Sequence, residues 1–332
     1  MKRFIAIVLA VLMMTAVLAG CSGNTSTSGS DATEAAADTA DKTFNIGICQ
    51  LVQHVALDAA TQGFKDYLTD KLGDKVTFNE QNAQGDSATC TTIANQFVAD
   101  GVDLILGNAT PALQAAFTAT SDIPVLGTSI TDYGTALDIA NWTGVSGFNV
   151  SGTSDLAPLD GQADIIKELF PNAKTVGLLY CSAEPNSKYQ CDTISTYLAD
   201  YELKTFTFSD SNDIAAVAIS ACDECDVLYI PTDNTAASNT GIIDNIASEK
   251  KIPIVCGEEG ICSGCGVATL SISYYDLGQK TGEMAYDILV NGKDIASMEV
   301  EFAPATTQKY DAARAEALGI TIPETYEAIT AE

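Results

Sequence analysis

The sequence is poor in positive charge and in histidine, and each shortage excludes a class of function. Its 332 residues include 16 Lys and Arg against 44 Asp and Glu, which gives a formal charge of -28. No basic cluster follows the first three residues, so nucleic acid is not expected as a partner. The single histidine, His54, cannot make a His-rich metal site, and it leaves a Ser/His/Asp triad one candidate base. No metal site is predicted from this composition.

Glycine is missing from the turn after the first predicted strand. Residues Leu51 to Leu57 contain none, so neither a G-x-G-x-x-G nor a G-x-x-x-x-G-K phosphate loop is present there. We therefore expect no nucleotide cofactor, and no cofactor of another kind is indicated. His54 lies in this turn, and we expect it to form a hydrogen bond there rather than to act as a base, with contact to a ligand as the alternative.

The first twenty residues have the pattern of a secretory signal peptide. Two basic residues precede an apolar run, Phe4 to Leu18, that is too short for a membrane span. The run ends in Leu18-Ala19-Gly20-Cys21, which resembles a bacterial lipobox, so we expect cleavage of residues 1–20 and a lipid on Cys21. Residues 21–43 are rich in small and polar residues, as a flexible tether is, which disfavours an uncleaved anchor. The body is predicted to be extracytoplasmic, anchored to the outer face of the cell membrane.

From Phe44 onward, short apolar runs alternate with amphipathic stretches. Nine runs are predicted as strands: Phe44 to Gln50, Val76 to Glu80, Val102 to Leu106, Ile123 to Gly127, Thr175 to Tyr180, Lys204 to Phe208, Val227 to Ile230, Ile252 to Cys256 and Val267 to Ile272. Strands that alternate with helices predict an α/β protein with parallel sheets. Ligand sites in such sheets lie at the carboxyl ends of the strands.

A pattern that occurs twice in the sequence indicates two similar, Rossmann-like lobes. Val102 to Thr110 and Asp226 to Asn234 each read as a strand and a polar turn, and each leads through a helix to a strand that starts Ile-Pro. We interpret Phe148 to Thr153 as the first crossover between the lobes. The sequence-based division is residues 44–150 and 268–294 for the N-terminal lobe, and residues 151–267 and 295–332 for the C-terminal lobe.

Polar side chains follow the strands at the points where ligands bind in parallel sheets. Thr110 before Pro111 predicts an N-cap and a first helical residue, with free N–H groups that suit a carboxylate. In the second lobe Thr232-Asp233-Asn234-Thr235 offers an N-cap and a spare carboxylate, and Glu258 follows a later strand. Donors in one lobe and acids in the other suit a zwitterion. The alternative is that each residue only caps its own helix.

Six segments resemble the solute-binding lipoproteins of ABC importers in the tryptophan/tyrosine-type branch. They are Ile46-Gly47-Ile48-Cys49-Gln50, His54 to Asp58, Ala109 to Ala115, Ser151 to Asp155, Pro231 to Thr235 and Gly257 to Gly260. The resemblance spans about Phe44 to Ile320. It implies a periplasmic-binding-protein type I fold with three crossovers, an amino acid, often aromatic, clamped between two lobes, and an ABC permease as the membrane partner.

The same resemblance implies a set of ligand-binding residues. Those expected to touch the backbone groups of the amino acid are Thr110, Ser182, Asn186, Asp233 and Asn234, with Gln50 and Glu258 near by. The turns are poor in aromatic residues, so the side-chain preference is not set by the sequence.

Ten cysteines leave several interpretations open. With Cys21 assigned to the lipid, nine remain, and an odd number cannot all pair. Cys222-x-x-Cys225 and Cys262-x-x-Cys265 have the internal spacing of a four-thiolate zinc site. Short-range disulfides, such as Cys262 with Cys265, and free thiols are the alternatives. A thioredoxin-like role is disfavoured, because two acids stand between Cys222 and Cys225 and would raise a thiol pKa.

Two functional classes follow from these patterns. The favoured one is a monomeric binding protein, not an enzyme, whose lobes close on a small solute and present it to a permease. The alternative is a secreted enzyme that uses Glu258 or Asp233 as an acid or base. A DNA-binding regulator of the same fold is disfavoured, since no basic N-terminal helix pair is present.

Overall fold

The computed structural model describes residues 42–330. The predicted signal peptide, Cys21 and nearly all of the tether lie outside the described residues. Within the described part, no helix combines the length and the apolar character needed to cross a membrane.

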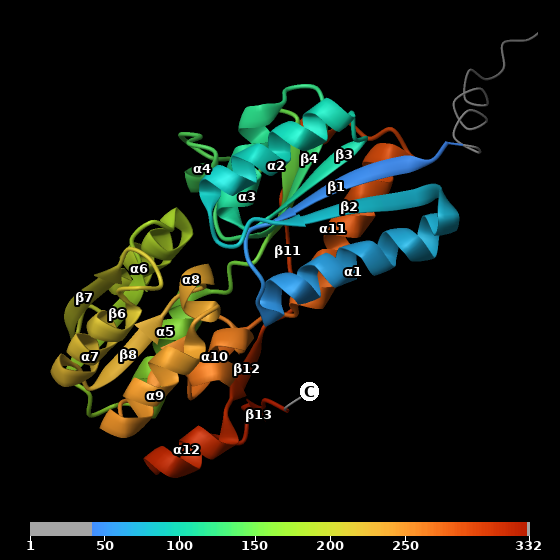
Figure 1. The fold of residues 1–332 in the computed structure, drawn as a ribbon. Coiled ribbons are helices and arrows are strands. Elements are labelled where there is room, and N and C mark those ends of the chain that lie inside the picture. Colours follow the sequence, from blue (N-terminus) through green and yellow to red (C-terminus); the bar gives the residue numbers. More distant parts are fainter. Residues whose placement is uncertain (1–41, 331–332) are drawn as a thin grey trace, which may run out of the picture. The chain divides into compact units, whose positions relative to one another are not determined.

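The first lobe is built on a six-stranded parallel sheet with the order β11-β5-β4-β3-β1-β2 (Figure 1). Its strands are β1 (Phe44–Gln50), β2 (Val76–Asn82), β3 (Leu104–Asn108), β4 (Val125–Ile130), β5 (Val150–Ser154) and β11 (Glu301–Phe302). Its helices are α1 (Val55–Leu72), α2 (Ser87–Asp100), α3 (Thr110–Ala119), α4 (Tyr133–Ala136) and α11 (Tyr274–Leu289), with single 3-10 turns at Gly73–Lys75 and Ile295–Ser297.

The second lobe is built on a seven-stranded sheet with the order β13-β12-β10-β9-β8-β6-β7, in which only the β10–β12 pair is antiparallel. Its strands are β6 (Thr175–Cys181), β7 (Glu202–Phe208), β8 (Val227–Ile230), β9 (Ile254–Cys256), β10 (Ala268–Ser271), β12 (Thr307–Tyr310) and β13 (Glu327–Ala328). Its helices are α5 (Leu159–Leu169), α6 (Pro185–Tyr197), α7 (Ile214–Glu224), α8 (Asn234–Ala237), α9 (Thr240–Lys250), α10 (Glu259–Cys265) and α12 (Ala312–Leu318).

The central strands are buried along their whole length because helices cover both faces of each sheet. Every residue of β3, β4 and β8 is buried. Helices α1 and α11, far apart in the sequence, lie side by side on the first lobe (Figure 1). Their backbones meet at Gly63 and Gly278, where an added Cβ would stand 2.1 and 2.0 Å from a carbonyl oxygen of the other helix. Glycine is required at both positions.

All nine predicted strands are present, with ends that shift by a few residues. Strands β5, β11, β12 and β13 were not predicted. The segment interpreted as a crossover, Phe148 to Thr153, contains most of β5. Its small polar side chains suggested a loop, yet they are buried and hydrogen-bonded. Ser151 donates to Met298 O at 3.1 Å, and the Thr153 and Thr281 hydroxyls are 2.8 Å apart. Internal partners for the hydroxyls let a polar sequence form an interior strand.

The two sheets correct the sequence-based lobe boundaries. Strand β5 belongs to the first sheet, so the chain leaves that lobe after Ser154 and not at residue 151. It returns only after Ser271, because β10 pairs with β9 of the second sheet, and not at residue 268. It leaves again between Phe302 and Thr307, because β11 pairs with β5, and not at residue 295. The chain passes between the sheets three times.

Candidate functional site

The turns at the carboxyl ends of the strands in the two lobes adjoin one another. His54, after β1, has its Nε2 3.3 Å from Asn234 Oδ1, at the start of α8. Gln190 of α6 donates from Nε2 to Thr131 Oγ1, after β4, at 3.2 Å. Each contact joins a residue of the first lobe to one of the second. The boundary between the lobes therefore runs along the turns where the sequence placed its ligand residues.

The sequence predicted Thr110 as the N-cap of α3, and this prediction is wrong. The N-cap is Ala109, at φ +85°, and Thr110 and Pro111 are the first two helical residues. Pro111 has no N–H, and the N–H groups of Ala112 and Leu113 donate to Ala109 O, so the Thr110 N–H is the backbone donor left without a partner here in residues 42–330. Thr110 is buried, and no hydrogen bond of its hydroxyl is found among residues 42–330. The start of α3 thus offers unused donors and a positive helix end.

Ser129, at the end of β4, is a candidate that the sequence analysis missed. It has φ +57°, in the left-handed region that non-glycine residues rarely occupy. The pairing of β4 with β5 shifts register between Gly127 and Ile130, around this residue. The Ser129 hydroxyl is buried and has no hydrogen-bond partner in the described structure. Backbone strain and an unpaired buried hydroxyl at a strand end are typical of a ligand contact.

Gln50 uses its side chain inside the first lobe. Its Oε1 accepts a hydrogen bond from Thr61 at 2.7 Å, and its Nε2 donates to Asp58 Oδ1 at 2.7 Å and to Val52 O at 3.0 Å. These bonds hold the turn between β1 and α1 in place. Gln50 lies at the predicted edge of the sheet, and its bonds make it a support for the turn that carries His54.

Asp233 lies at the start of α8 and has its whole carboxylate engaged. Oδ1 accepts from the N–H of Ala236 at 2.8 Å, as an N-cap does. Oδ2 accepts from the N–H of Cys181 and from the hydroxyl of Ser187, both at 2.7 Å. The N-cap expected within Thr232 to Thr235 is present, and the structure assigns it to Asp233. The carboxylate was expected to be spare, and it is instead held by three neutral donors.

Glu184 was not among the predicted residues, yet its carboxylate is buried beside Asp233. It precedes Pro185 at the start of α6 and caps a different helix, α8. It accepts from the backbone and side-chain nitrogens of Asn234 at 2.9 and 2.7 Å, and from the N–H and hydroxyl of Thr235 at 2.8 and 2.7 Å. All these donors are neutral. An acid directly before proline was the available sequence signal.

Asn186 and Asn234 both donate hydrogen bonds to the Glu184 carboxylate. Asn186 donates from Nδ2 to Glu184 Oε2 at 3.1 Å and to Thr232 O at 3.0 Å, whereas its own Oδ1 is buried without a partner. Asn234 places its Nδ2 on Glu184 and its Oδ1 toward His54. The structure thus brings the predicted residues Asn186, Asp233 and Asn234 together.

Ser182 and Glu258 are less closely connected to this group. Ser182 is exposed, and its hydroxyl donates to Phe208 O at 3.2 Å within the second lobe. Glu258 is buried and caps α10 through the N–H groups of Gly260 and Ile261. It behaves as the helix cap that the sequence analysis kept as the alternative.

Four buried carboxyl groups lie near the lobe boundary, and none forms an ion pair among those found in residues 42–330. They are Asp155, Glu184, Asp233 and Glu258. Burial, with the charge of Glu184, raises the pKa of Asp233 to about 8. Burial raises the pKa of Glu258 to about 7 and that of Asp155 to about 6. A cation bound here would favour the charged form of these carboxyls and lower their pKa values, because the described residues supply no cation for them.

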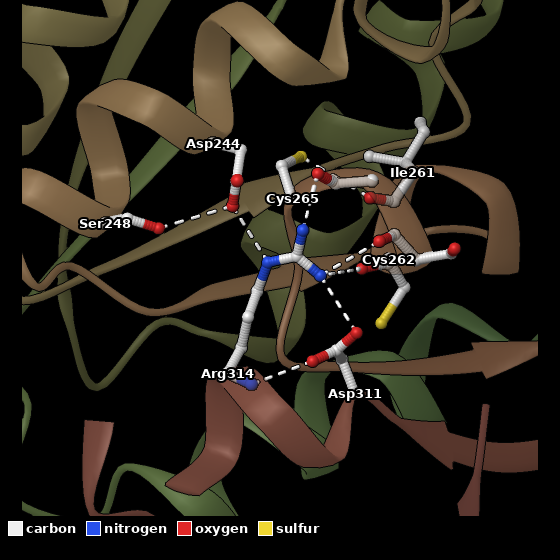
Figure 2. Close-up of polar contacts among 9 residues, drawn as sticks. Asp244, Ser248, Ile261, Cys262, Cys265, Asp311 and Arg314 are labelled. Carbon is white, nitrogen blue, oxygen red and sulfur yellow. Dashed lines mark hydrogen bonds and ion pairs between the residues drawn. The ribbon is translucent and has the colours of Figure 1, made fainter. Parts of the chain in front are cut away.

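Helix α10, which begins after Glu258, is fixed at its other end by Arg314 (Figure 2). The guanidinium donates to the carbonyls of Ser263 at 2.9 Å and Gly264 at 2.7 Å, and it pairs with Asp244 and Asp311. A cation on the last carbonyls of a helix is favourable. A cavity of about 150 Å³ beside Arg314 lies near the amino end of β9, at the edge of the sheet opposite the site.

The nine cysteines among the described residues are all buried and free. The Cys262–Cys265 disulfide is therefore not formed. No group of three or more His, Cys, Asp or Glu in residues 42–330 is arranged to hold a metal ion, so the four-thiolate site is absent from this region. Burial raises the pKa of Cys222 and of Cys225 to about 11, which argues against a reactive thiolate.

Comparison with known proteins identifies the family. The ABC transporter substrate binding protein family matches residues 45–332. The chain is 38% identical over 304 residues to a tyrosine-binding protein of Clostridioides difficile, covering 90% of this chain and 87% of the relative. At 14% identity, a branched-chain amino acid binding protein of Streptococcus pneumoniae in complex with isoleucine shares the fold, with a TM-score of 0.56.

Two solved structures, one with a bound ligand and one ligand-free and open, can be compared with this structure. A Streptococcus pneumoniae protein in complex with L-Trp has 34% identity and a TM-score of 0.82. A ligand-free, open substrate-binding protein with adhesive properties from Clostridium difficile has 37% identity and a TM-score of 0.67. Both matches cover 87% of this chain and 100% of the other. The structure is therefore more similar to the ligand complex than to the open form.

The fold and the comparisons agree with the resemblance seen in the sequence. The structure has two lobes with largely parallel sheets, and its relatives have the periplasmic-binding-protein type I fold. Substrate-binding proteins of ABC importers are extracytoplasmic. The chain belongs to the ABC transporter substrate-binding protein family, whose members capture a small solute for an ABC importer.

Proposed function

We propose that the solute is an L-amino acid with an aromatic or bulky apolar side chain. The relatives support this class, since one is a tyrosine-binding protein and another was crystallised with L-Trp. The observation that carries the proposal is chemical: buried carboxylates without a cation face the lobe boundary from one side, and unused donors face it from the other. A zwitterion complements both sides.

The ammonium group binds the second lobe in this proposal. Glu184 and Asp233 each accept hydrogen bonds from neutral donors only, so an ammonium ion supplies the positive charge that they lack. Asn186 Oδ1, buried without a partner, is a further acceptor for an ammonium N–H. Asn234 and Glu258 complete the acidic surroundings.

The carboxylate binds the first lobe at the start of α3. The hydroxyl and the N–H of Thr110, at the start of this ten-residue helix, have no hydrogen-bond partner in residues 42–330 and can donate to the carboxylate. Ser129 adds a buried hydroxyl from the neighbouring strand end. Gln50 acts through the β1–α1 turn, and exposed Ser182 contributes at the rim of the site. The ligand then contacts both lobes, so it favours the closed arrangement over the open one.

The same proposal covers attachment and partners. Cys21 carries a lipid that holds a monomeric body at the outer face of the membrane, and a permease receives the amino acid. The protein is a carrier and not an enzyme, because Glu258 and Asp233 both act as helix caps. This use of their oxygens disfavours the alternative of an acid or base pair.

Calorimetry with the purified mature body tests the ligand class. The titrants are the twenty L-amino acids, glucose and galactose, followed by two analogues of the best amino acid. We expect an aromatic or bulky apolar amino acid to bind, its N-acetyl derivative to fail at the second lobe, and its methyl ester to bind more weakly than the parent. Sugar binding without any amino acid response would refute the class.

A further inference from the structure

Gln190 and Thr131 join the two lobes without lying among the proposed ligand contacts. Gln190 of α6 donates to the Thr131 hydroxyl at 3.2 Å, and both side chains are buried, at 1% and 3% exposed. A hydrogen bond between groups on separate lobes breaks when the lobes part. Both groups then reach water.

On the second lobe, Gln190 is held ready for this bond. Its Oε1 accepts from the N–H of Thr232 at 3.1 Å, and its Nε2 also approaches Asn186 O at 3.3 Å. Thr232 directly precedes Asp233 in the chain, and Asn186 lies two residues after Glu184. The orientation of Gln190 is therefore fixed by the turns that we assign to the ammonium.

On the first lobe, Thr131 is fixed at the crossovers. Its hydroxyl donates to Asp155 Oδ1 at 3.2 Å, and its carbonyl accepts from Ser154 at 2.9 Å. Asp155 follows β5 on the first crossover, and its Oδ2 accepts from Tyr274, which follows the second crossover, at 2.9 Å. The Thr131 hydroxyl thus accepts from the opposite lobe while it donates to a carboxylate between two crossovers.

We infer that the Gln190–Thr131 hydrogen bond is a latch that stabilises the closed lobes and strengthens binding of every solute by the same factor. The inference rests on the proposed function, in that solute capture closes the lobes. A bond made only in the closed state reduces the cost of closure, whichever ligand fills the site. The greater similarity to the L-Trp complex than to the open relative agrees with a closed latch in this structure.

Thr131→Val, Gln190→Met and the double variant test the latch through L-tyrosine and L-tryptophan affinity. We expect each single variant to weaken both ligands by a similar factor, about 3- to 10-fold, as for one neutral hydrogen bond. The double variant should lose less than the product of the two single losses, because both remove the same bond. Thr118→Val, which removes an exposed first-lobe hydroxyl, is the matched control and should bind normally.

Spin labels separate the latch from the ligand class. Labels at Thr91→Cys on α2 and Ser220→Cys on α7 report the distance between lobes, since both sites are exposed and the described native thiols are buried. Thr131→Val should increase the open fraction with and without L-tyrosine. If the wild-type protein binds no amino acid, the proposed ligand class fails and the distances alone decide the latch. Unchanged distances, or additive losses in the double variant, overturn it.

Discussion

Glu184 caps a helix that begins 50 residues further along the chain: its carboxylate accepts the N–H of Asn234 at 2.9 Å. The contact exists because β6 and β8 are neighbours in the second sheet, which brings the turns after them together. Through it, the charge of one strand-end turn lies at the positive end of the helix in another. Several expected outcomes follow from this arrangement and from the first-lobe donors opposite it.

Replacing Glu184 with Gln removes the charge and turns an acceptor into a donor that faces the nitrogens of Asn234. We expect the protein to fold with reduced stability and to lose about 2 to 3 kcal/mol of L-tyrosine binding free energy, because the ammonium loses its counter-charge. Calorimetry measures the affinity, and urea unfolding measures the stability. Glu202→Gln, an exposed site on β7, is the control; an equal affinity loss there would contradict a specific role.

Replacing Ser129 with Ala should separate ligand binding from folding. The hydroxyl has no partner in the described structure, so its removal breaks no hydrogen bond of the protein and should leave the thermal midpoint of the free protein nearly unchanged. L-Tyrosine affinity should fall by about 1 kcal/mol, as for a lost hydrogen bond to the ligand. Ser220→Ala on exposed α7 serves as the control. Unaltered affinity in Ser129→Ala would remove Ser129 from the site.

Stability should fall as pH rises from about 5 to about 8. Asp155, Glu258 and Asp233 have pKa values of about 6, 7 and 8, above the value near 4 expected for an unfolded chain. The folded state therefore binds more protons than the unfolded state in this window. For each carboxyl that is protonated only in the folded state, the free energy of unfolding falls by about 1.4 kcal/mol for each unit by which the pH rises. Urea titrations at several pH values measure the slope, which Glu258→Gln should reduce. A flat profile would contradict these shifts.

Ligand binding should release protons near pH 7.5. An ammonium beside Asp233 lowers the pKa of this carboxyl, which is about 8 in the free protein, so affinity should rise with pH between about 6 and 8. A neutral Asp233 can keep its contacts by donating to Ser187 instead of accepting from it. Calorimetry in buffers of different ionisation enthalpy counts the released protons. Asp233→Asn should abolish most of the release; equal release in that variant would assign the proton elsewhere.

Attachment can be tested in cells. We expect Cys21→Ser to leave the protein unprocessed or to release it into the medium, because no thiol remains for the lipid. Membrane fractionation and the mass of the mature chain decide the outcome. Normal mass and unchanged membrane retention would show that Cys21 is not the attachment point.

The sequence determined the architecture because local patterns carry it. Buried parallel strands need continuous apolar runs, and nine such runs were recognisable. The N-cap at Asp233 was also predictable, since capping joins residues three apart, as Asp233 and Ala236 are. Strand β5 was not recognisable, because its buried hydroxyls form hydrogen bonds with residues more than 100 positions away, such as Met298 and Thr281.

Tertiary structure alone decided which polar groups were used and which remained free. Thr110 was expected to be a cap and Gln50 to lie beside the ligand. The cap residue is instead Ala109, with its strained backbone, and Thr61 and Asp58 bind the Gln50 amide. Glu184 carried only the weak signal of an acid before proline, and Ser129 carried none. Their roles depend on which strands are adjacent and where their register shifts, and such non-local pairing has no counterpart in the spacing of residues along the chain.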